Sequence, residues 1–143
     1  MERAFTRTGR VFVLKLNEGE HPHSGIEEML AKQDIKFAWI TGIGGFSWAR
    51  IGVFDPVNRK YDTMDIEPME GHVLEVVSLA GNSVLGEDGN YHTHLHVNIA
   101  RNPGEPYSGH LVDAIVTPFL ELLVVELLGD DKSIRGMFKH RWS

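Results

Sequence analysis

Three histidines, His92, His94 and His96, alternate along one short stretch of the chain. Side chains point to opposite faces of a β-strand in turn, so a strand here places the three imidazoles on one face and Leu95 and Val97 on the other. Neutral imidazole binds zinc and other divalent metals. Two imidazoles at i and i+2 reach one ion, because their Cα atoms lie about 6.5–7 Å apart. The spacing predicts part of a metal site, and a row of surface histidines that bind nothing is the alternative.

A third ligand has to come from another segment, and His110 is the leading candidate. The stretch Ser108-Gly109-His110-Leu111 follows a short loop, 101–106, that is able to return the chain beside the histidine-containing strand. Three histidines leave a tetrahedral metal with one open position, the arrangement of a catalytic or ligand-binding zinc.

Other stretches offer weaker chemistry. The glycines at positions 42, 44 and 45 are followed by Phe46-Ser47-Trp48, which has no helix signal, so we interpret them as a bend between strands and not as a nucleotide-binding loop. Three glutamates, Glu75, Glu121 and Glu126, lie within apolar runs, and we expect each to face solvent; a buried, paired carboxylate is the alternative. No nucleophile signature of the Ser-His-Asp kind is evident.

Length and composition limit the classes of protein. The chain has 143 residues and no cysteine, which fits one domain without disulfides. No apolar run is long enough to span a membrane and the start has no signal-peptide core, so we expect a cytoplasmic protein with no membrane partner. The net charge of −6 and the scattered Lys and Arg residues disfavour DNA binding. A basic tail, residues 132–141, is interpreted as a solvated end, and a weak nucleic-acid or partner contact is the alternative.

The elements that position these residues are mostly strands. Ser24 and Glu27 resemble a capping box at the start of a short amphipathic helix, residues 25–33. Alternating or β-branched runs predict strands at 10–16, 37–40, 49–54, 61–66, 73–79, 91–100, 111–116 and 120–128. A buried helix is the alternative for 120–128. We therefore expect an α+β fold: a mainly antiparallel sheet of roughly six to eight strands with one helix in the N-terminal half.

The order of several motifs resembles one known family, the plants and prokaryotes conserved domain (PPC domain). The motifs that carry the resemblance are Glu75-Val76-Val77-Ser78-Leu79-Ala80-Gly81, His94-Leu95-His96-Val97, Gly109-His110-Leu111 and Leu120-Glu121-Leu122-Leu123-Val124. Phe12-Val13-Leu14-Lys15-Leu16 and Gly42-Ile43-Gly44 also match the pattern. The resemblance covers about residues 8–128, which predicts a single domain over 1–143 with a C-terminal tail, 129–143.

The resemblance implies a homotrimer in which His94, His96 and His110 bind zinc or another divalent transition metal. It leaves His92 without a counterpart, as a residue beside the site or on a pH-sensitive surface. Plant members use the domain in nuclear DNA-binding proteins, after an AT-hook, and stand-alone prokaryotic members are often described as predicted DNA-binding proteins. This chain has no Arg-Gly-Arg-Pro hook, and Ser108 stands where the family usually has glycine.

Three functions follow as alternatives. The first is a homotrimeric metal-binding protein without established catalysis, which binds a small molecule or a protein partner in a regulatory role. The second is a DNA-binding regulator. The third is a metal-dependent hydrolase or lyase, in which a metal-bound water is activated and Glu75 or Glu121 acts as base.

Overall fold

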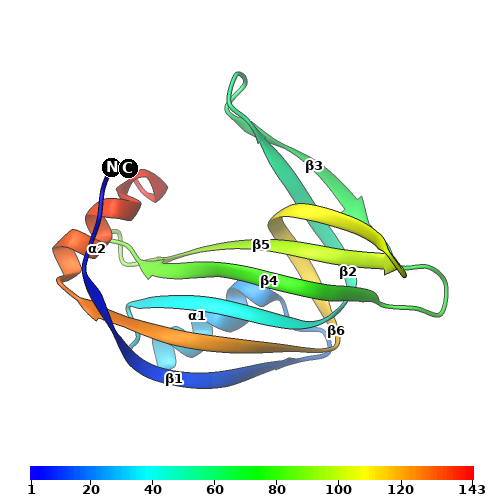
Figure 1. Ribbon diagram of the computed structural model, residues 1–143, viewed down its shortest axis with the longest axis horizontal. Helices are drawn as coiled ribbons and strands as arrows, with labels where there is room; N and C mark the ends of the chain where they lie inside the picture. Colours follow the sequence, from blue (N-terminus) through cyan, green and yellow to red (C-terminus); the bar gives the residue numbers. More distant parts are fainter.

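The computed structural model describes all 143 residues and confirms an α+β fold built on one antiparallel sheet (Figure 1). The sheet has six strands, within the predicted range of six to eight, and the chain has two α-helices where one was predicted. The elements are β1 (Thr6–Asn17), α1 (Pro22–Lys32), β2 (Phe37–Asp55), β3 (Lys60–Ile66), β4 (Leu74–Leu85), β5 (Tyr91–Asn102), β6 (Glu105–Gly129), α2 (Asp131–Phe138) and the 3₁₀ turn η1 (Lys139–Arg141).

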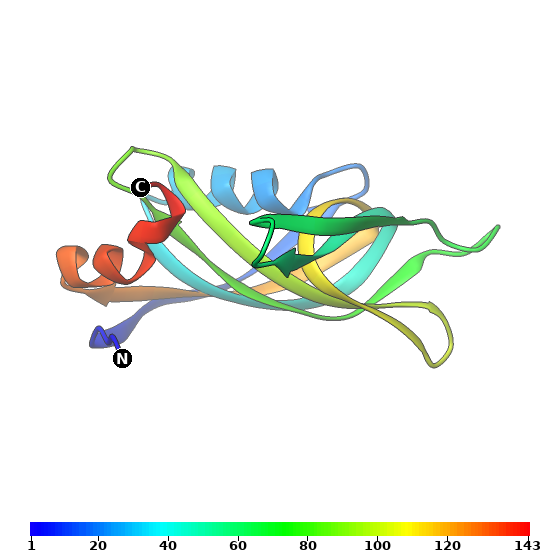
Figure 2. The same ribbon diagram turned by 90° about the horizontal axis from the view of Figure 1, so that it is seen from above.

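The strands pair in the order β1-β6-β5-β4-β2-β3, and β6 also pairs with β2. Since β2 contacts β4 along one edge and β6 along the other, the pairings β2-β4-β5-β6 form a closed ring. A sheet closed in this way has to curve, and Figure 2 shows α1 lying over the concave side of the curved strands. The curvature brings β5 and the first part of β6 together, where the candidate ligands lie.

Alternation along β5 separates the core from the histidines. Leu95, Val97 and Ile99 are at most 4% exposed and belong to the same apolar core as Ile26 and Leu30 of α1. Full burial of one such side chain contributes about 1.5–3 kcal/mol. A slip of one residue in the strand register would turn the histidines into the core, so this burial holds the imidazoles on the opposite face.

Two strands each unite two of the strands that the sequence patterns predict. The predicted strands 37–40 and 49–54 are parts of β2, and 111–116 and 120–128 are parts of β6, which confirms a strand and not a helix at 120–128. The glycines at 42–45 therefore do not separate two strands: they form an irregularity within β2. A Cβ at Gly44 would lie 2.7 Å from the Cα of Leu120, so the close approach of β2 to β6 explains the glycine.

The start of α1 differs from the predicted capping box. The helix begins at Pro22, and His21 is the N-cap without a side-chain capping bond. Proline suits the first helical position because its missing N–H would have no partner there. Ser24 instead donates from Oγ to the carbonyl of His21, at 3.3 Å. This earlier start leaves the Glu27 side chain free of any capping role.

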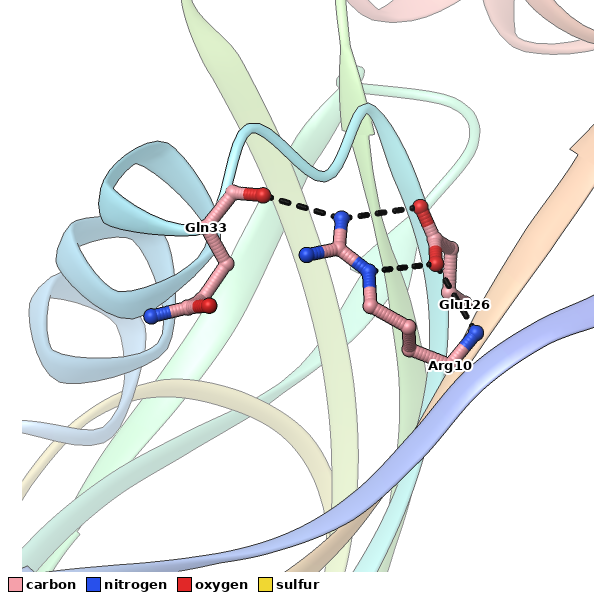
Figure 3. Close-up of polar contacts among 3 residues, drawn as sticks. All are labelled: Arg10, Gln33 and Glu126. Carbon is pink, nitrogen blue, oxygen red and sulfur yellow. Dashed lines mark hydrogen bonds and ion pairs between the residues drawn. The ribbon is translucent and has the colours of Figure 1, made fainter.

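Of the three glutamates in apolar runs, Glu75 and Glu121 are exposed as expected, but Glu126 is buried. Its carboxylate accepts hydrogen bonds from the backbone N–H of Arg10 at 2.8 Å and from Nε and Nη2 of that side chain at 2.9 and 3.2 Å (Figure 3). Arg10 Nη2 also donates to the carbonyl of Gln33, at 2.9 Å. These bonds lower the pKa of Glu126 and connect β1 and β6 to the C-terminal end of α1.

The C-terminal tail is not simply a solvated end, because residues 131–138 form α2. Asp130 caps this helix by accepting a hydrogen bond from the backbone N–H of Ser133, at 2.8 Å. Ile134 is 3% exposed and packs with Phe37 and Val84. This packing holds the last residues of the chain beside β5. Neither helix is long and apolar enough to cross a membrane.

Candidate metal centre

The structure brings His94, His96 and His110 together, as the sequence predicts. His94 and His96 alternate with the buried Leu95 on β5, and His110 of β6 is the direct cross-strand neighbour of His96. One ligand atom from each of the three imidazoles lies within 4.8 Å of the others. The ring centroids are 4.9 Å apart for His94 and His96, 5.0 Å for His94 and His110, and 5.8 Å for His96 and His110. The three side chains therefore form a group that could hold a metal ion.

Two glycines allow the strands to approach closely at this point. Gly81 of β4 pairs with Leu95, and a Cβ on Gly81 would overlap the carbonyl oxygen of His94. Gly109 lies where β6 leaves β5 for β2, and a Cβ there would come within 2.8 Å of the carbonyl oxygen of Gly52. A larger residue at either position would force the neighbouring strand away, because the contacts are with backbone atoms that have no rotamer to change.

The environment favours the neutral form of two of the imidazoles. Burial, followed by the charge of Arg141 and the neighbouring histidines, lowers the pKa of His94 to about 4. Burial also lowers the pKa of His110, with smaller contributions from His96 and His23. A neutral imidazole has a free lone pair for a metal, so the lowered pKa values reduce competition between protons and a metal at these two side chains.

The donor set fits a tetrahedral zinc ion. Zinc–nitrogen bonds of 2.0–2.1 Å place two ligand nitrogens roughly 3.3 Å apart. The Nε2 atoms of His94 and His96 are 3.1 Å apart, close to that separation. His110 stacks on Tyr61 with the ring centroids 4.4 Å apart, and its buried Nδ1 has no hydrogen-bond partner. Stacking on Tyr61 restricts rotation of the His110 ring, and an unpartnered buried nitrogen is a polar atom that binding of a metal by this ring would help to explain.

His92 does not belong to this group. Its Nε2 lies 2.8 Å from Oδ2 of Asp88, and its ring contacts Trp142 at a centroid distance of 5.2 Å. The structure thus separates His92 from the other two histidines of the alternating stretch.

Several residues beside the histidines were not identified from the sequence. A cavity of about 560 Å³ is lined by His94 and His110 together with Glu27, Tyr61, Tyr91 and Arg141. Arg141 Nη2 lies 3.4 Å from Nδ1 of His94, and Nη1 donates to the carbonyl of His92 at 3.1 Å. Only packing of the tail brings Arg141 here, and no local pattern in the sequence marks it.

The acidic residues near the centre also differ from expectation. Glu75 and Glu121 line a separate groove with Ile43 and Phe119, in which none of the three histidines takes part. Neither residue is therefore in place to act as a base at the metal. Glu27 is the carboxylate that lines the histidine cavity.

Comparison with known proteins shows which family and which structures this chain is similar to. The sequence matches the model of the Plants and Prokaryotes Conserved (PCC) domain, also written PPC, over residues 3–128. The structure is similar to that of a PPC protein from Pyrococcus horikoshii, with 29% identity and a TM-score of 0.82 over 91% of this chain and 87% of that one. A metal-containing protein from Archaeoglobus fulgidus has 32% identity and a TM-score of 0.80 over 90% of this chain and 87% of its own.

A candidate DNA-binding protein from Ralstonia eutropha JMP134 shares the fold, at 21% identity and a TM-score of 0.71 over 81% of this chain and 76% of its own. No protein of curated function matches the sequence. The family match spans both histidine motifs and all six strands, and it ends at Leu128, one residue before the end of β6. The chain belongs to the Plants and Prokaryotes Conserved domain family.

Proposed function

We propose that this PPC-domain protein binds zinc, or another divalent transition metal, through His94, His96 and His110, and that the bound metal serves as the receptor for a ligand in a regulatory role. The observation that carries the proposal is the convergence of three imidazole nitrogens within 4.8 Å. The metal-containing relative from Archaeoglobus fulgidus, at 32% identity, supports it.

The number of histidines determines what the metal can do. Structural zinc sites are closed by four protein ligands, whereas three protein ligands leave a position for water or an added ligand. The adjoining cavity of about 560 Å³ is lined by His94 and His110 and has the size of a small-molecule site. Ligand binding at the metal is therefore a better account of the centre than a purely structural role.

Metal analysis of protein purified without an affinity tag tests the proposal. We expect about one zinc ion per chain by plasma emission spectrometry, after dialysis against metal-free buffer. Protein that retains far less than one equivalent of any divalent metal, and that takes up none on titration with zinc, would rule the proposal out.

We propose, in addition, that the chain assembles as a homotrimer through one face of its sheet. Five apolar side chains on β1, β2, β4 and β6 are 45–72% exposed there, and we call them the apolar sheet face: Val13, Trp39, Ile43, Val77 and Leu123. Val13 and Leu123 are cross-strand neighbours. A contiguous exposed apolar face of this kind is typical of an interaction surface. In the trimer implied by the family resemblance, the partner at this surface is another copy of the same chain.

DNA binding is the alternative function suggested by the name of the Ralstonia protein, whose 21% identity supports the fold alone. The net charge of −6 opposes it, because phosphate neutralisation by Lys and Arg supplies most sequence-independent affinity. We expect no gel retardation of a DNA duplex at micromolar protein in low salt, where electrostatic attraction is strongest. Retardation that weakens steeply as salt is added would favour the DNA-binding function instead.

A further inference from the structure

The guanidinium of Arg141 is half-buried and has no carboxylate partner. Two other arginines form ion pairs, Arg10 with Glu126 and Arg50 with Asp65. Around Arg141 the polar contacts are the carbonyl of His92 and Nδ1 of His94, and the guanidinium lies 4.5 Å from the ring centroid of Phe138. Burial alone lowers its pKa, with no opposing contribution from an acid. The protein thus holds a positive charge, partly out of water, without neutralising it.

The hydrogen-bond capacity of this side chain is also incompletely used. A guanidinium has five N–H donors in one plane, and Arg141 uses two of them. The guanidinium lies over the ring of Phe138, and Arg141 lines the cavity that also contains His94 and His110. Unused guanidinium donors beside a cavity are suited to a planar anion that accepts two parallel hydrogen bonds.

The proposed metal strengthens this requirement. Neutral imidazole has one nitrogen that accepts and one that carries a proton. If Nε2 of His94 binds a metal, its Nδ1 carries the proton and no longer accepts the bond from Arg141 Nη2. Arg141 then loses one of its two acceptors, and an added ligand is the group able to replace it.

We propose that this cavity binds the anion of a small carboxylic acid. The carboxylate group pairs with Arg141, and a second oxygen of the same molecule occupies the open position of the metal held by His94, His96 and His110. This inference rests on the proposed function and names its ligand class. Arg141 Nη2 lies 3.4 Å from Nδ1 of His94, and Nε2 of the same ring lies 3.1 Å from Nε2 of His96. The guanidinium and the proposed metal position therefore adjoin the same imidazole, and we choose ligands whose second oxygen is one or two carbons from the carboxylate.

Charge favours a carboxylate over a phosphate. The lining of the cavity has one permanent cation, Arg141, and one carboxylate, Glu27; its other titratable nitrogens belong to four histidines, His92, His94, His110 and His140. A phosphate dianion is usually bound by several cationic or backbone N–H donors, whereas one planar fork is sufficient for a carboxylate. The two tyrosines, Tyr61 and Tyr91, add aromatic surface that suits a short carbon chain more than a second charged group.

The test uses the full chain loaded with cobalt(II), whose visible absorption reports on the coordination of the metal. Metal content is measured first in every sample. L-lactate and 3-hydroxypropionate, which carry a hydroxyl one and two carbons from the carboxylate, are then titrated into the protein, with lactamide and inorganic phosphate as comparison probes. We expect at least one of the two hydroxy acids to change the cobalt spectrum saturably, and lactamide and phosphate to bind at least about tenfold more weakly.

Variants show whether Arg141 is responsible. We expect Arg141→Gln to keep its metal and to weaken hydroxy-acid binding at least about tenfold, and Arg141→Lys to restore only part of the affinity because it lacks the planar fork. Lys139→Gln is the matched control: it removes one charge from the same turn, at an exposed side chain that does not line the cavity. Its affinity for the hydroxy acid should be unchanged.

The outcomes separate the two proposals. If the wild-type protein holds no metal, the proposed function fails. If the metal is bound but neither hydroxy acid alters the spectrum, or if Arg141→Gln binds it as tightly as the wild type, the carboxylate site is wrong and the metal centre stands. Binding of phosphate as tight as that of the hydroxy acid would overturn the choice of ligand class.

Discussion

We expect the His94→Ala variant to bind zinc at least about a hundredfold more weakly than the wild-type protein. Changing a residue that only orients a ligand typically costs 10–100-fold in affinity, so removal of a ligand costs at least as much. The loss is large because His94 is one of only three converging imidazoles, with the centroids of the other two 4.9 and 5.0 Å away. Competition titration with a chromogenic chelator measures this affinity.

His92→Ala is the matched control, since it removes an imidazole from the same strand and the same face. His92 contacts Asp88 and Trp142 and is not part of the converging group. We therefore expect this variant to bind zinc in a 1:1 ratio with an affinity within about threefold of the wild type. Equal loss of zinc in the two variants would mean that the alternating stretch, and not the three-residue group, binds the metal.

Thermal unfolding provides a second measurement of the same effect. A ligand at a hundred times its dissociation constant stabilises the folded state by about 2.7 kcal/mol. Added zinc should raise the melting temperature of the wild-type protein and of His92→Ala, and it should leave that of His94→Ala unchanged. Near-equal melting temperatures of the metal-free proteins would show that all three chains are folded.

Leu123→Asp converts the proposed trimer into monomers. Leu123 lies beside Val13 and Thr41 at the centre of the apolar sheet face. An aspartate there would be buried by the neighbouring subunits without a partner, and the penalty for a buried ion is several kcal/mol. In the isolated chain Leu123 is 45% exposed, so the carboxylate reaches solvent and the monomer folds. Light scattering should show a fall from about three times the chain mass to the 16.1 kDa of one chain.

Val57→Asp is the control for that experiment. Val57 is 86% exposed and lies in the turn between β2 and β3, away from the apolar sheet face. The same chemical change at this position should leave the mass of the assembly unaltered. A wild-type protein that scatters light as a monomer, or a Leu123→Asp protein that stays trimeric, would contradict the proposed interface.

The apolar sheet face and the metal centre are neighbours, which connects the two predictions. Trp39 of β2 pairs with Asn82 of β4, and Asn82 pairs with His94 of β5. These three side chains and His96 line a second cavity, of about 270 Å³. Subunits that meet over Trp39 would therefore cover one side of the centre, and the cavity containing Arg141 would remain as the approach for a ligand.

Much of the fold was accessible from local sequence patterns. The period of two in β5 predicts both the buried row at Leu95, Val97 and Ile99 and the histidines on the other face, because side-chain alternation is a property of a single strand. The patterns were less informative about where helices and strands begin and end. The capping box predicted at Ser24 does not form, since Pro22 starts the helix two residues earlier. Competing local signals of similar strength cannot be ranked without the packing around them.

Burial of charge was the least predictable property. Glu121 and Glu126 lie in the same apolar run of β6, yet Glu121 is exposed and Glu126 is buried against Arg10. Their spacing of five places them on opposite faces of a strand, but only the closed sheet decides which face is covered by β1 and α1. The partner lies 116 positions away, so no local window contains it.

The sequence by itself determined that two imidazoles of one strand share a face, because that follows from the geometry of an extended backbone. Only the tertiary structure decided the rest of the centre. The register between β5 and β6 places His110 opposite His96, and the burial of Ile134 brings Arg141 to His94. Both contacts join segments that are distant in the chain, and they form because the sheet closes and the last helix packs on the core.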